Sequence, residues 1–146
     1  MTRLTINEAG TSGYTDELIL TPSDFTTAAG NTTTVVNFPV KAGDLIDACA
    51  LVVTEAFSTS SNITIGPDGT ARSAGADADG FIEADNANAT GTSVNTGDLL
   101  DDGGGAGENR FKGAADANIT ITAASALNDD TSGRMRVLFS VKRTNF

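Results

Sequence analysis

The sequence predicts an all-β protein built as a single β-sandwich, and three observations lead to this prediction. Apolar residues recur with a period near two far more often than with the helical period of about 3.6. Short apolar and β-branched runs are separated by clusters of glycine, aspartate, asparagine and serine, which favour turns. A chain of 146 residues has the length of one ordinary domain. Short strands joined by such turns are typical of a β-sandwich, and we expect a jelly-roll-like one with long loops rich in glycine and aspartate.

The strands are predicted in chain order over residues 17–20, 32–40, 45–57, 62–65, 80–84, 118–123 and 134–142. Residues 32–40 are rich in β-branched side chains, and Pro39 near their end predicts a strand that stops or reaches a sheet edge. Residues 45–57 are apolar on both faces, which is typical of a central strand. One face is expected to hold Leu45, Cys49, Leu51, Val53 and Phe57, and the other Ile46, Ala48, Ala50, Val52 and Thr54.

The last predicted strand alternates most cleanly. One side is expected to hold Met135, Val137, Phe139 and Val141, and the other Arg134, Arg136, Ser140 and Lys142. Turn-forming residues cluster at 66–70, 101–105 and 128–133. Residues 93–100 are the one segment where we expect a short helix to intrude among the strands.

Two regions are predicted along the chain. Residues 1–16 are polar and rich in glycine and threonine, which predicts an extended N-terminal arm that orders on contact with a neighbour, or an ordinary frayed terminus. Residues 17–146 are expected to form the sandwich. The N-terminus lacks a basic stretch followed by an apolar run, and no segment approaches about 20 apolar residues. We therefore expect a soluble chain made without a signal peptide.

Composition argues against an enzyme. The chain has no histidine, which is the commonest general base and transition-metal ligand. Its one cysteine, Cys49, lies in the most apolar predicted strand and is expected to be a small core residue. The absence of tryptophan and the presence of a single tyrosine, Tyr14, offer little for stacking on a sugar. A non-enzymatic structural or interaction domain without a cofactor is the expected class.

Two acidic clusters and one glycine run are candidates for a metal, catalytic or phosphate-binding site. Asp77, Asp79 and Glu83 resemble part of a calcium loop, but their spacing departs from the EF-hand pattern, and a solvated acidic loop is the simpler interpretation. A second cluster contains Asp98, Asp101 and Asp102, where paired carboxylates suggest a hydrolase as a minor alternative. The run 103–107 lacks the lysine of a phosphate-binding loop, so a plain loop is expected there.

The charge is distributed unevenly along the chain. A net charge of −10 argues against nucleic acid or an anionic membrane as the main partner. Basic residues nevertheless gather at the C-terminus, namely Arg134, Arg136, Lys142 and Arg143. They either balance the charge of a solvated strand face or pair with an acidic surface of another subunit. The terminal Phe146 is either a further core residue or a side chain that docks on a neighbour.

The order of several short segments resembles that of small virion structural proteins encoded by tailed bacteriophages. The segments are Asp-Phe-Thr at 24–26, Val-Val-Asn-Phe-Pro-Val-Lys-Ala-Gly-Asp at 35–44, Val-Thr-Glu-Ala-Phe at 53–57, an Ile-x-Ile-Gly strand, Asp-Gly-Phe at 79–81, and the closing pair at 118–122 and 133–139. The resemblance spans residues 17–143. It rests on strand order, composition and loop character rather than on a single diagnostic motif.

This resemblance implies a capsid decoration, or cement, protein that is made in the host cytoplasm and reinforces the outer surface of the capsid. Its implied partners are the major capsid protein of the same virion and further copies of itself, with a homotrimer as the expected oligomer. The expected contact residues are Arg3, Leu4 and Ile6 in the arm, and Arg134, Arg136, Lys142, Arg143 and Phe146 at the C-terminus. A tail-associated or host-recognition module with the same fold is the alternative.

Overall fold

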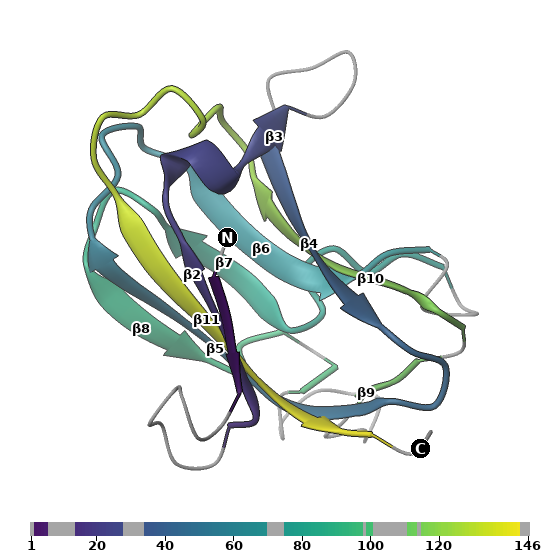
Figure 1. Cartoon of the computed structure of the whole chain (residues 1–146). Helices are drawn as coiled ribbons and strands as arrows, with labels where there is room; N and C mark the ends of the chain where they lie inside the picture. Colours follow the sequence, from purple (N-terminus) through teal and green to yellow (C-terminus); the bar gives the residue numbers. More distant parts are fainter. Residues whose placement is uncertain are drawn as a thin grey trace.

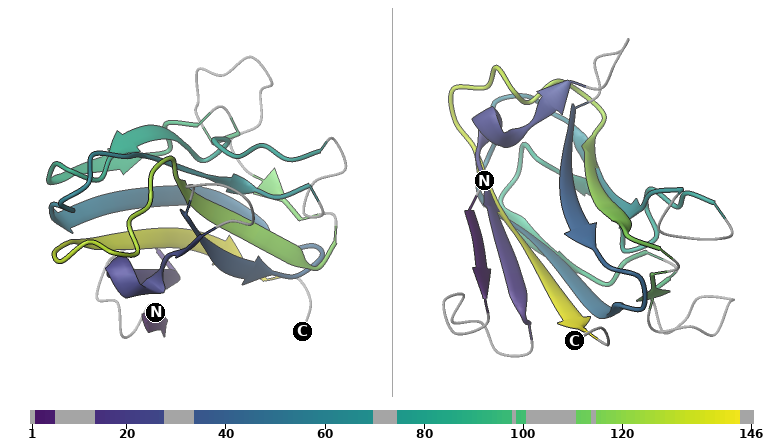
Figure 2. Two further views of the ribbon diagram at one scale, coloured as in Figure 1. Left: turned by 90° about the horizontal axis from the view of Figure 1, so that it is seen from above. Right: turned by 45° about the vertical axis from the view of Figure 1, so that its right-hand side comes forward.

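The computed structural model describes residues 2–5, 14–27, 34–69, 75–97, 99–100, 111–113 and 115–143. They form two antiparallel sheets that lie face to face as a sandwich (Figures 1 and 2). In sheet A the strand order is β1 (Thr2–Thr5), β2 (Asp16–Leu20), β11 (Arg134–Lys142), β5 (Leu45–Glu55) and β8 (Gly91–Val94), and β9 (Phe111–Lys112) also pairs with β5. In sheet B it is β3 (Thr26–Thr27), β4 (Thr34–Val40), β10 (Ala117–Ala123), β6 (Asn62–Pro67) and β7 (Ile82–Asn86). The predicted all-β sandwich is confirmed.

The chain crosses repeatedly from one sheet to the other. After β2 in sheet A it enters β4 in sheet B, returns to sheet A in β5, and crosses again to β6 and β7. Sheet A then receives β8, sheet B receives β10, and sheet A receives β11. The order β2-β11-β5-β8 therefore lies opposite β4-β10-β6-β7. The jelly-roll-like connectivity expected from the sequence stays a prediction.

One hydrophobic core fills the space between the sheets. The Phe38 ring of β4 stacks on the Phe139 ring of β11 with centroids 4.5 Å apart, which joins the two sheets at their centre. Cys49 is fully buried in the same core, as the sequence predicted, and burial raises the pKa of its thiol. The core side chains of β11 are the four predicted ones, Met135, Val137, Phe139 and Val141.

The central strand β5 differs from its prediction at one end. It lies between β11 and β8, so its central position is confirmed. Ser140 pairs with Ala48 but Val141 pairs with Ile46, which leaves Asp47 as an extra residue in a β-bulge. The bulge reverses the alternation, so Ile46 is buried in the core with Cys49, and its predicted place on the other face is wrong.

The helix expected over residues 93–100 is not found in the described part of that segment. Residues up to Val94 belong to β8, and Asn95 (φ 49°) is bound to β5 by two hydrogen bonds. The Asn95 amide donates to the Cys49 carbonyl (3.0 Å), and the Cys49 amide donates to Asn95 Oδ1 (2.8 Å). Among the described residues the one helix is a short 3-10 turn, η1 (Pro22–Asp24), and none is long and apolar enough to span a membrane.

Several strand boundaries also differ from the prediction. The strand expected at 80–84 is β7, which begins two residues later, and β6 continues to Pro67 in the segment predicted to be a turn. Strands β1, β3, β8 and β9 were not predicted; each is only two to four residues long, which is too short for a clear alternation. The turn expected at 128–133 is confirmed by the Asp130 amide, which donates to the Leu127 carbonyl (3.1 Å).

A close backbone contact at Gly66 positions the segment that returns from β6 to β7. The Asp77 amide donates to the Pro67 carbonyl (3.0 Å), and the Phe81 amide donates to the Ile65 carbonyl (2.9 Å). These bonds draw the returning chain across Gly66, where a Cβ would lie 1.8 Å from the Asp77 carbonyl oxygen. Only glycine fits beneath this backbone.

Replacing Gly66 with alanine should destabilise the protein by about 3 kcal/mol, because the new methyl group overlaps a backbone oxygen that is held by hydrogen bonds. The matched control is Gly91→Ala in β8, where a Cβ has no neighbour within 4 Å and the change should stay within about 0.5 kcal/mol. Urea unfolding of both variants measures the difference. Equal stabilities would show that the contact at Gly66 does not exist in solution.

Candidate interaction surface

The outer face of sheet B is mainly polar, with Val35 and Pro39 of β4 as apolar exceptions. Thr120 of β10 lies directly opposite Asn37 of β4, and Thr122 of β10 lies directly opposite Thr64 of β6. The Thr120 hydroxyl lies 3.2 Å from Asn37 Oδ1 and donates a hydrogen bond to it. Apolar residues of the same strands point inward, so β10 shows the alternation of a strand with one solvated face.

The outer face of sheet A carries apolar residues on adjacent strands, interrupted by polar ones such as Glu17, Arg136 and Ser140. We call its apolar residues the sheet A surface, comprising Ile19, Ala48, Ala50, Val52, Val94 and Leu138. Leu138 lies directly opposite Ala50, and Ala50 lies opposite Val94. Leu138 is 2% exposed, whereas Val94, on the edge strand β8, is 49% exposed. The sheet A surface therefore has a buried centre and an apolar edge that reaches solvent.

An ion pair lies within the sheet A surface, since Arg136 is opposite Ile19 and Val52 in register. The Glu17 side chain of β2 is only 2% exposed and accepts a hydrogen bond from Nε of Arg136 on β11. Arg136 keeps a third of its side chain exposed. A buried carboxylate is costly without a cationic partner, so the guanidinium of Arg136 is needed inside its own chain.

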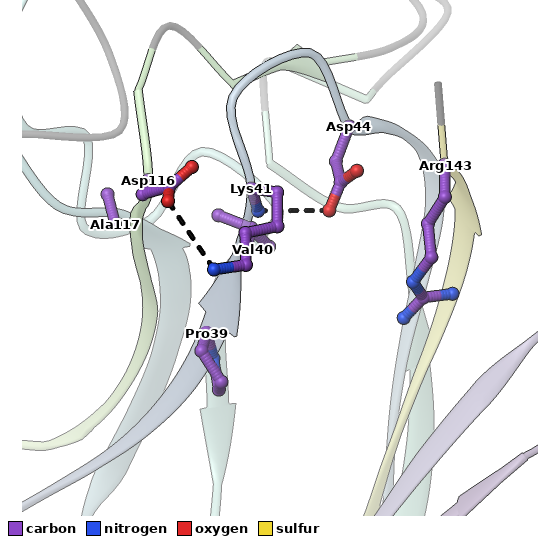
Figure 3. Close-up of a pocket in the computed structure, with 7 residues that line it drawn as sticks. All are labelled: Pro39, Val40, Lys41, Asp44, Asp116, Ala117 and Arg143. Carbon is purple, nitrogen blue, oxygen red and sulfur yellow. Dashed lines mark hydrogen bonds and ion pairs between the residues drawn. The ribbon is translucent and has the colours of Figure 1, made fainter. Parts of the chain in front are cut away.

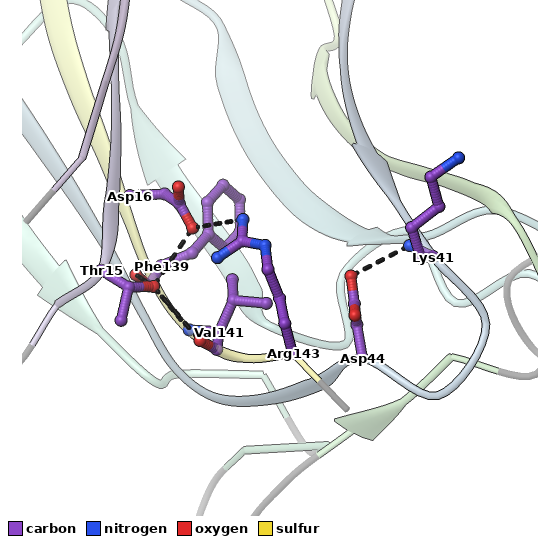
Figure 4. A network of polar contacts seen from close by, with 7 residues as sticks. All are labelled: Thr15, Asp16, Lys41, Asp44, Phe139, Val141 and Arg143. Carbon is purple, nitrogen blue, oxygen red and sulfur yellow. Dashed lines mark hydrogen bonds and ion pairs between the residues drawn. The ribbon is translucent and has the colours of Figure 1, made fainter. Parts of the chain in front are cut away.

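The other C-terminal basic residues also lie near acids of the same chain. Lys142 Nζ is 3.2 Å from a carboxylate oxygen of Asp47, and Arg143 Nη2 donates to Oδ2 of the buried Asp16 at 2.9 Å (Figure 4). Arg134 is exposed at the start of β11 and lies opposite Glu55 in register. These contacts support the interpretation that the basic strand balances local charge; its pairing with another subunit stays a prediction.

Thr15 and Asp16 hold the start of β2 against β11. The Thr15 amide donates to the Phe139 carbonyl (2.9 Å), and the Val141 amide donates to the Thr15 hydroxyl (2.8 Å). Figure 4 shows this network together with the ion pair between Asp16 and Arg143. The chain is thus fixed at the point where it enters β2.

The N-terminal residues expected to form an arm are only partly described. Arg3 and Leu4 belong to β1, which pairs with β2 of the same chain; there Arg3 is opposite Leu18 and Leu4 is opposite Glu17. Ile6 and Phe146 lie outside the described residues. Thr2–Thr5 therefore forms an edge strand of sheet A rather than a separate extension.

A small hollow lies at the end of the sandwich where β4 turns into β5 (Figure 3). Its volume is about 310 Å³, and it is lined by Pro39, Val40, Lys41, Asp44, Asp116, Ala117 and Arg143. Asp44 accepts a hydrogen bond from the Lys41 amide (3.0 Å), and Asp116 accepts one from the Ala42 amide (2.9 Å). The Ala42 amide and the Lys41 ammonium group lower the pKa of Asp116. Both carboxylates thus stabilise the turn between β4 and β5.

The calcium candidates do not come together. Among the described residues, no group of three or more acidic or cysteine side chains is placed to hold a metal ion. Asp79 and Glu83 are exposed, and Asp77 closes a turn in which its carbonyl accepts the Gly80 amide (3.1 Å). Asp98, Asp101 and Asp102 lie outside the described residues.

The fold and the sheet A surface define a β-sandwich protein whose outer faces differ, sheet B being mainly polar and sheet A carrying more apolar residues. Comparisons with protein-family models, with curated proteins and with solved structures found no match. The sequence analysis did not predict this surface, although Leu138 is a signal in the sequence, because it is an apolar residue among the polar positions of an otherwise alternating strand. The edge position of Val94 could not be predicted from the sequence, because the strand that contains it was not predicted.

Arg136→Ala should destabilise the protein by about 3 kcal/mol, because it leaves the Glu17 carboxylate buried without its cation. Lys41→Ala is the matched control, since its ion pair with Asp116 is exposed and solvent screens it, so its loss should leave the stability close to that of the wild type. Urea unfolding at neutral pH compares the two. A similar cost for both variants would mean that the Glu17 pair is solvated and contributes little.

The stabilising effect of Asp47 should disappear in acid. Burial alone would raise the pKa of Asp47, but hydrogen bonds from Ser140 and Lys142 and the charge of Lys142 bring it below the ordinary value of 3.8. The unfolded chain therefore binds this proton more tightly, so the contribution is complete above pH 3.8 and is lost as the pH falls through the lower folded value.

Asp47→Asn should accordingly be less stable than the wild type at neutral pH and converge with it as the pH falls below 3.8. Urea unfolding at a series of pH values measures the difference between the two proteins. A difference that is independent of pH would contradict the ionic role of this carboxylate.

Proposed function

We propose that this chain is a structural virion protein of a tailed bacteriophage that binds the outer surface of the capsid as an oligomer and reinforces the lattice. The observation that carries the proposal is the contrast between the two outer faces. Sheet B presents mainly threonine and asparagine, with Val35 and Pro39 as apolar exceptions, whereas the sheet A surface gathers apolar residues on adjacent strands around Arg136 and reaches solvent at Val94. Apolar residues combined with charged pairs are usual at protein–protein interfaces.

Charged residues accompany the sheet A surface as ion pairs within the chain. The pairs Glu17–Arg136 and Asp47–Lys142 lie on strands that also carry the sheet A surface. Because these charges are already paired within the chain, they attract a partner only weakly and serve mainly to fix the orientation in which it binds. Affinity for a partner then comes mainly from the apolar residues.

A cement protein needs only modest affinity per contact. Contacts repeated by the symmetry of a capsid act together, so the avidity of an oligomer exceeds the affinity of one copy. A small sandwich that offers one apolar face meets this requirement without a catalytic pocket. The resemblance to small phage virion proteins supplies the choice of a capsid, and specifically of its major capsid protein, as the partner.

The test is co-sedimentation of the purified chain with capsids of the corresponding phage that lack it. Wild-type protein should saturate the capsids at a fixed stoichiometry. Val94→Asp should weaken binding by about tenfold or more, since it places a charge at the exposed apolar edge of the interface. Asn37→Asp on the exposed outer face of sheet B adds the same charge, retains the acceptor used by Thr120, and should bind as the wild type does.

Each outcome is decisive for a different part of the proposal. No binding of the wild-type chain would overturn the capsid role and favour a tail-associated or host-recognition module. Binding that Asn37→Asp abolishes and Val94→Asp leaves intact would assign the interface to sheet B. Unfolding curves of both variants, expected within about 0.5 kcal/mol of the wild type, separate lost binding from lost folding.

A further inference from the structure

We propose that β1 is exchanged between copies, so that in the assembled oligomer the β2 edge of one copy is covered by Thr2–Thr5 of its neighbour. This inference rests on the oligomer of the proposed function and names the contact that builds it. The acceptor is the edge of β2 that β1 of the same chain covers in the structure, and the donor is the same segment of a second copy in the same register.

The position of β1 makes it separable from the rest of the fold. It is the end strand of sheet A, and β2 is its one neighbour in the sheet. The register places Thr2 opposite Ile19 and Thr5 opposite Asp16, so only a few residues of main chain are paired. A short edge strand of this kind is held by its ladder with one partner and can be supplied by another chain.

Strand β2 is held in place independently of β1. Its other side pairs with β11, with Leu20 opposite Met135 and Asp16 opposite Phe139. Leu18 and Leu20 are fully buried in the core between the sheets. Thr15 is bound to the main chain of β11 as described above, so β2 is anchored from its first residue without β1. Removal of β1 would therefore leave the acceptor edge in place.

The sequence between the two strands does not impose a hairpin. Ten residues, 6–15, join Thr5 to Asp16, whereas the loops of tight hairpins have about two to five residues. The register of β1 on β2 is thus not fixed by turn geometry. Fully extended, ten residues span up to about 35 Å, which is enough to reach an adjacent copy of a small domain.

Exchange within a closed ring conserves the contacts of the single chain. If every copy donates β1 to the next, each β2 edge is still covered by an identical strand, so no hydrogen bond of the ladder is lost. In dilute solution the ten-residue tether favours the chain's own strand, with an effective concentration in the millimolar range. Exchange is therefore expected where copies are held close together. A second copy of this chain covers the β2 edge with the same strand, so it needs no contact that the single chain does not already make.

Single cysteine variants test the exchange directly. Thr2→Cys and Ile19→Cys place cysteines on residues that are directly opposed in the ladder of β1 and β2, where an oxidant can join them. The two variants are mixed, unfolded and refolded together at concentrations up to the millimolar range, then oxidised and separated under non-reducing conditions. Thr92→Cys, on the opposite edge strand of the same sheet, replaces Ile19→Cys in the control mixture. Cys49 is buried and should not react.

Exchange predicts a covalent heterodimer that increases with concentration and exceeds the control mixture by about tenfold at the highest concentration. The double variant Thr2→Cys/Ile19→Cys reports whether β1 pairs with β2 at all. Intrachain cross-linking of the double variant, with no excess of heterodimer in the mixture, would show that β1 stays on its own chain. Absence of both products would show that this pairing does not form; either result overturns the proposal.

The exchange and the proposed function fail separately. Capsids saturated at fixed stoichiometry by a chain that gives no heterodimer would overturn the exchange alone. A heterodimer from a chain that does not sediment with capsids would overturn the capsid role and leave the exchange intact.

Discussion

The fold of this molecule depends on strand β11 and on the contact between its Phe139 ring and Phe38. Both faces of β11 make contacts that the fold needs. Its inner face brings Phe139 onto the Phe38 ring of the opposite sheet and fixes the spacing of the sandwich. Its outer face contributes Leu138 to the sheet A surface and Arg136 to the pair with Glu17. Strands β2 and β5 flank β11, so the core and the candidate surface share one central strand.

This arrangement explains which features the sequence predicted. The bounds and alternation of β11 were predicted correctly because alternate burial is a local property of a strand with one face in a core. The bulge at Asp47 was not predicted, since an extra residue is defined only by the register of the partner strand. Strand β8 was missed because its few small residues form a sheet edge through pairing with β5.

The candidate surface was predicted less well than the fold. The basic residues of β11 were identified as a feature, but their acidic partners come from β2 and β5, far away in sequence. Only the folded sheet brings Glu17 to Arg136 and Asp16 to Arg143. A charge pattern along a chain shows where cations gather, and it does not show whether they are already neutralised.

The neutralisation of these cations changes how recognition by this protein is understood. A cluster of four basic residues at the end of an acidic chain suggested attraction to an acidic partner. With Arg136, Lys142 and Arg143 each engaged by a carboxylate of the same chain, little net charge is left there to attract one. Under the proposed function, recognition would depend mainly on apolar contact at the edge of the sheet A surface, where Val94 is 49% exposed, and less on charge.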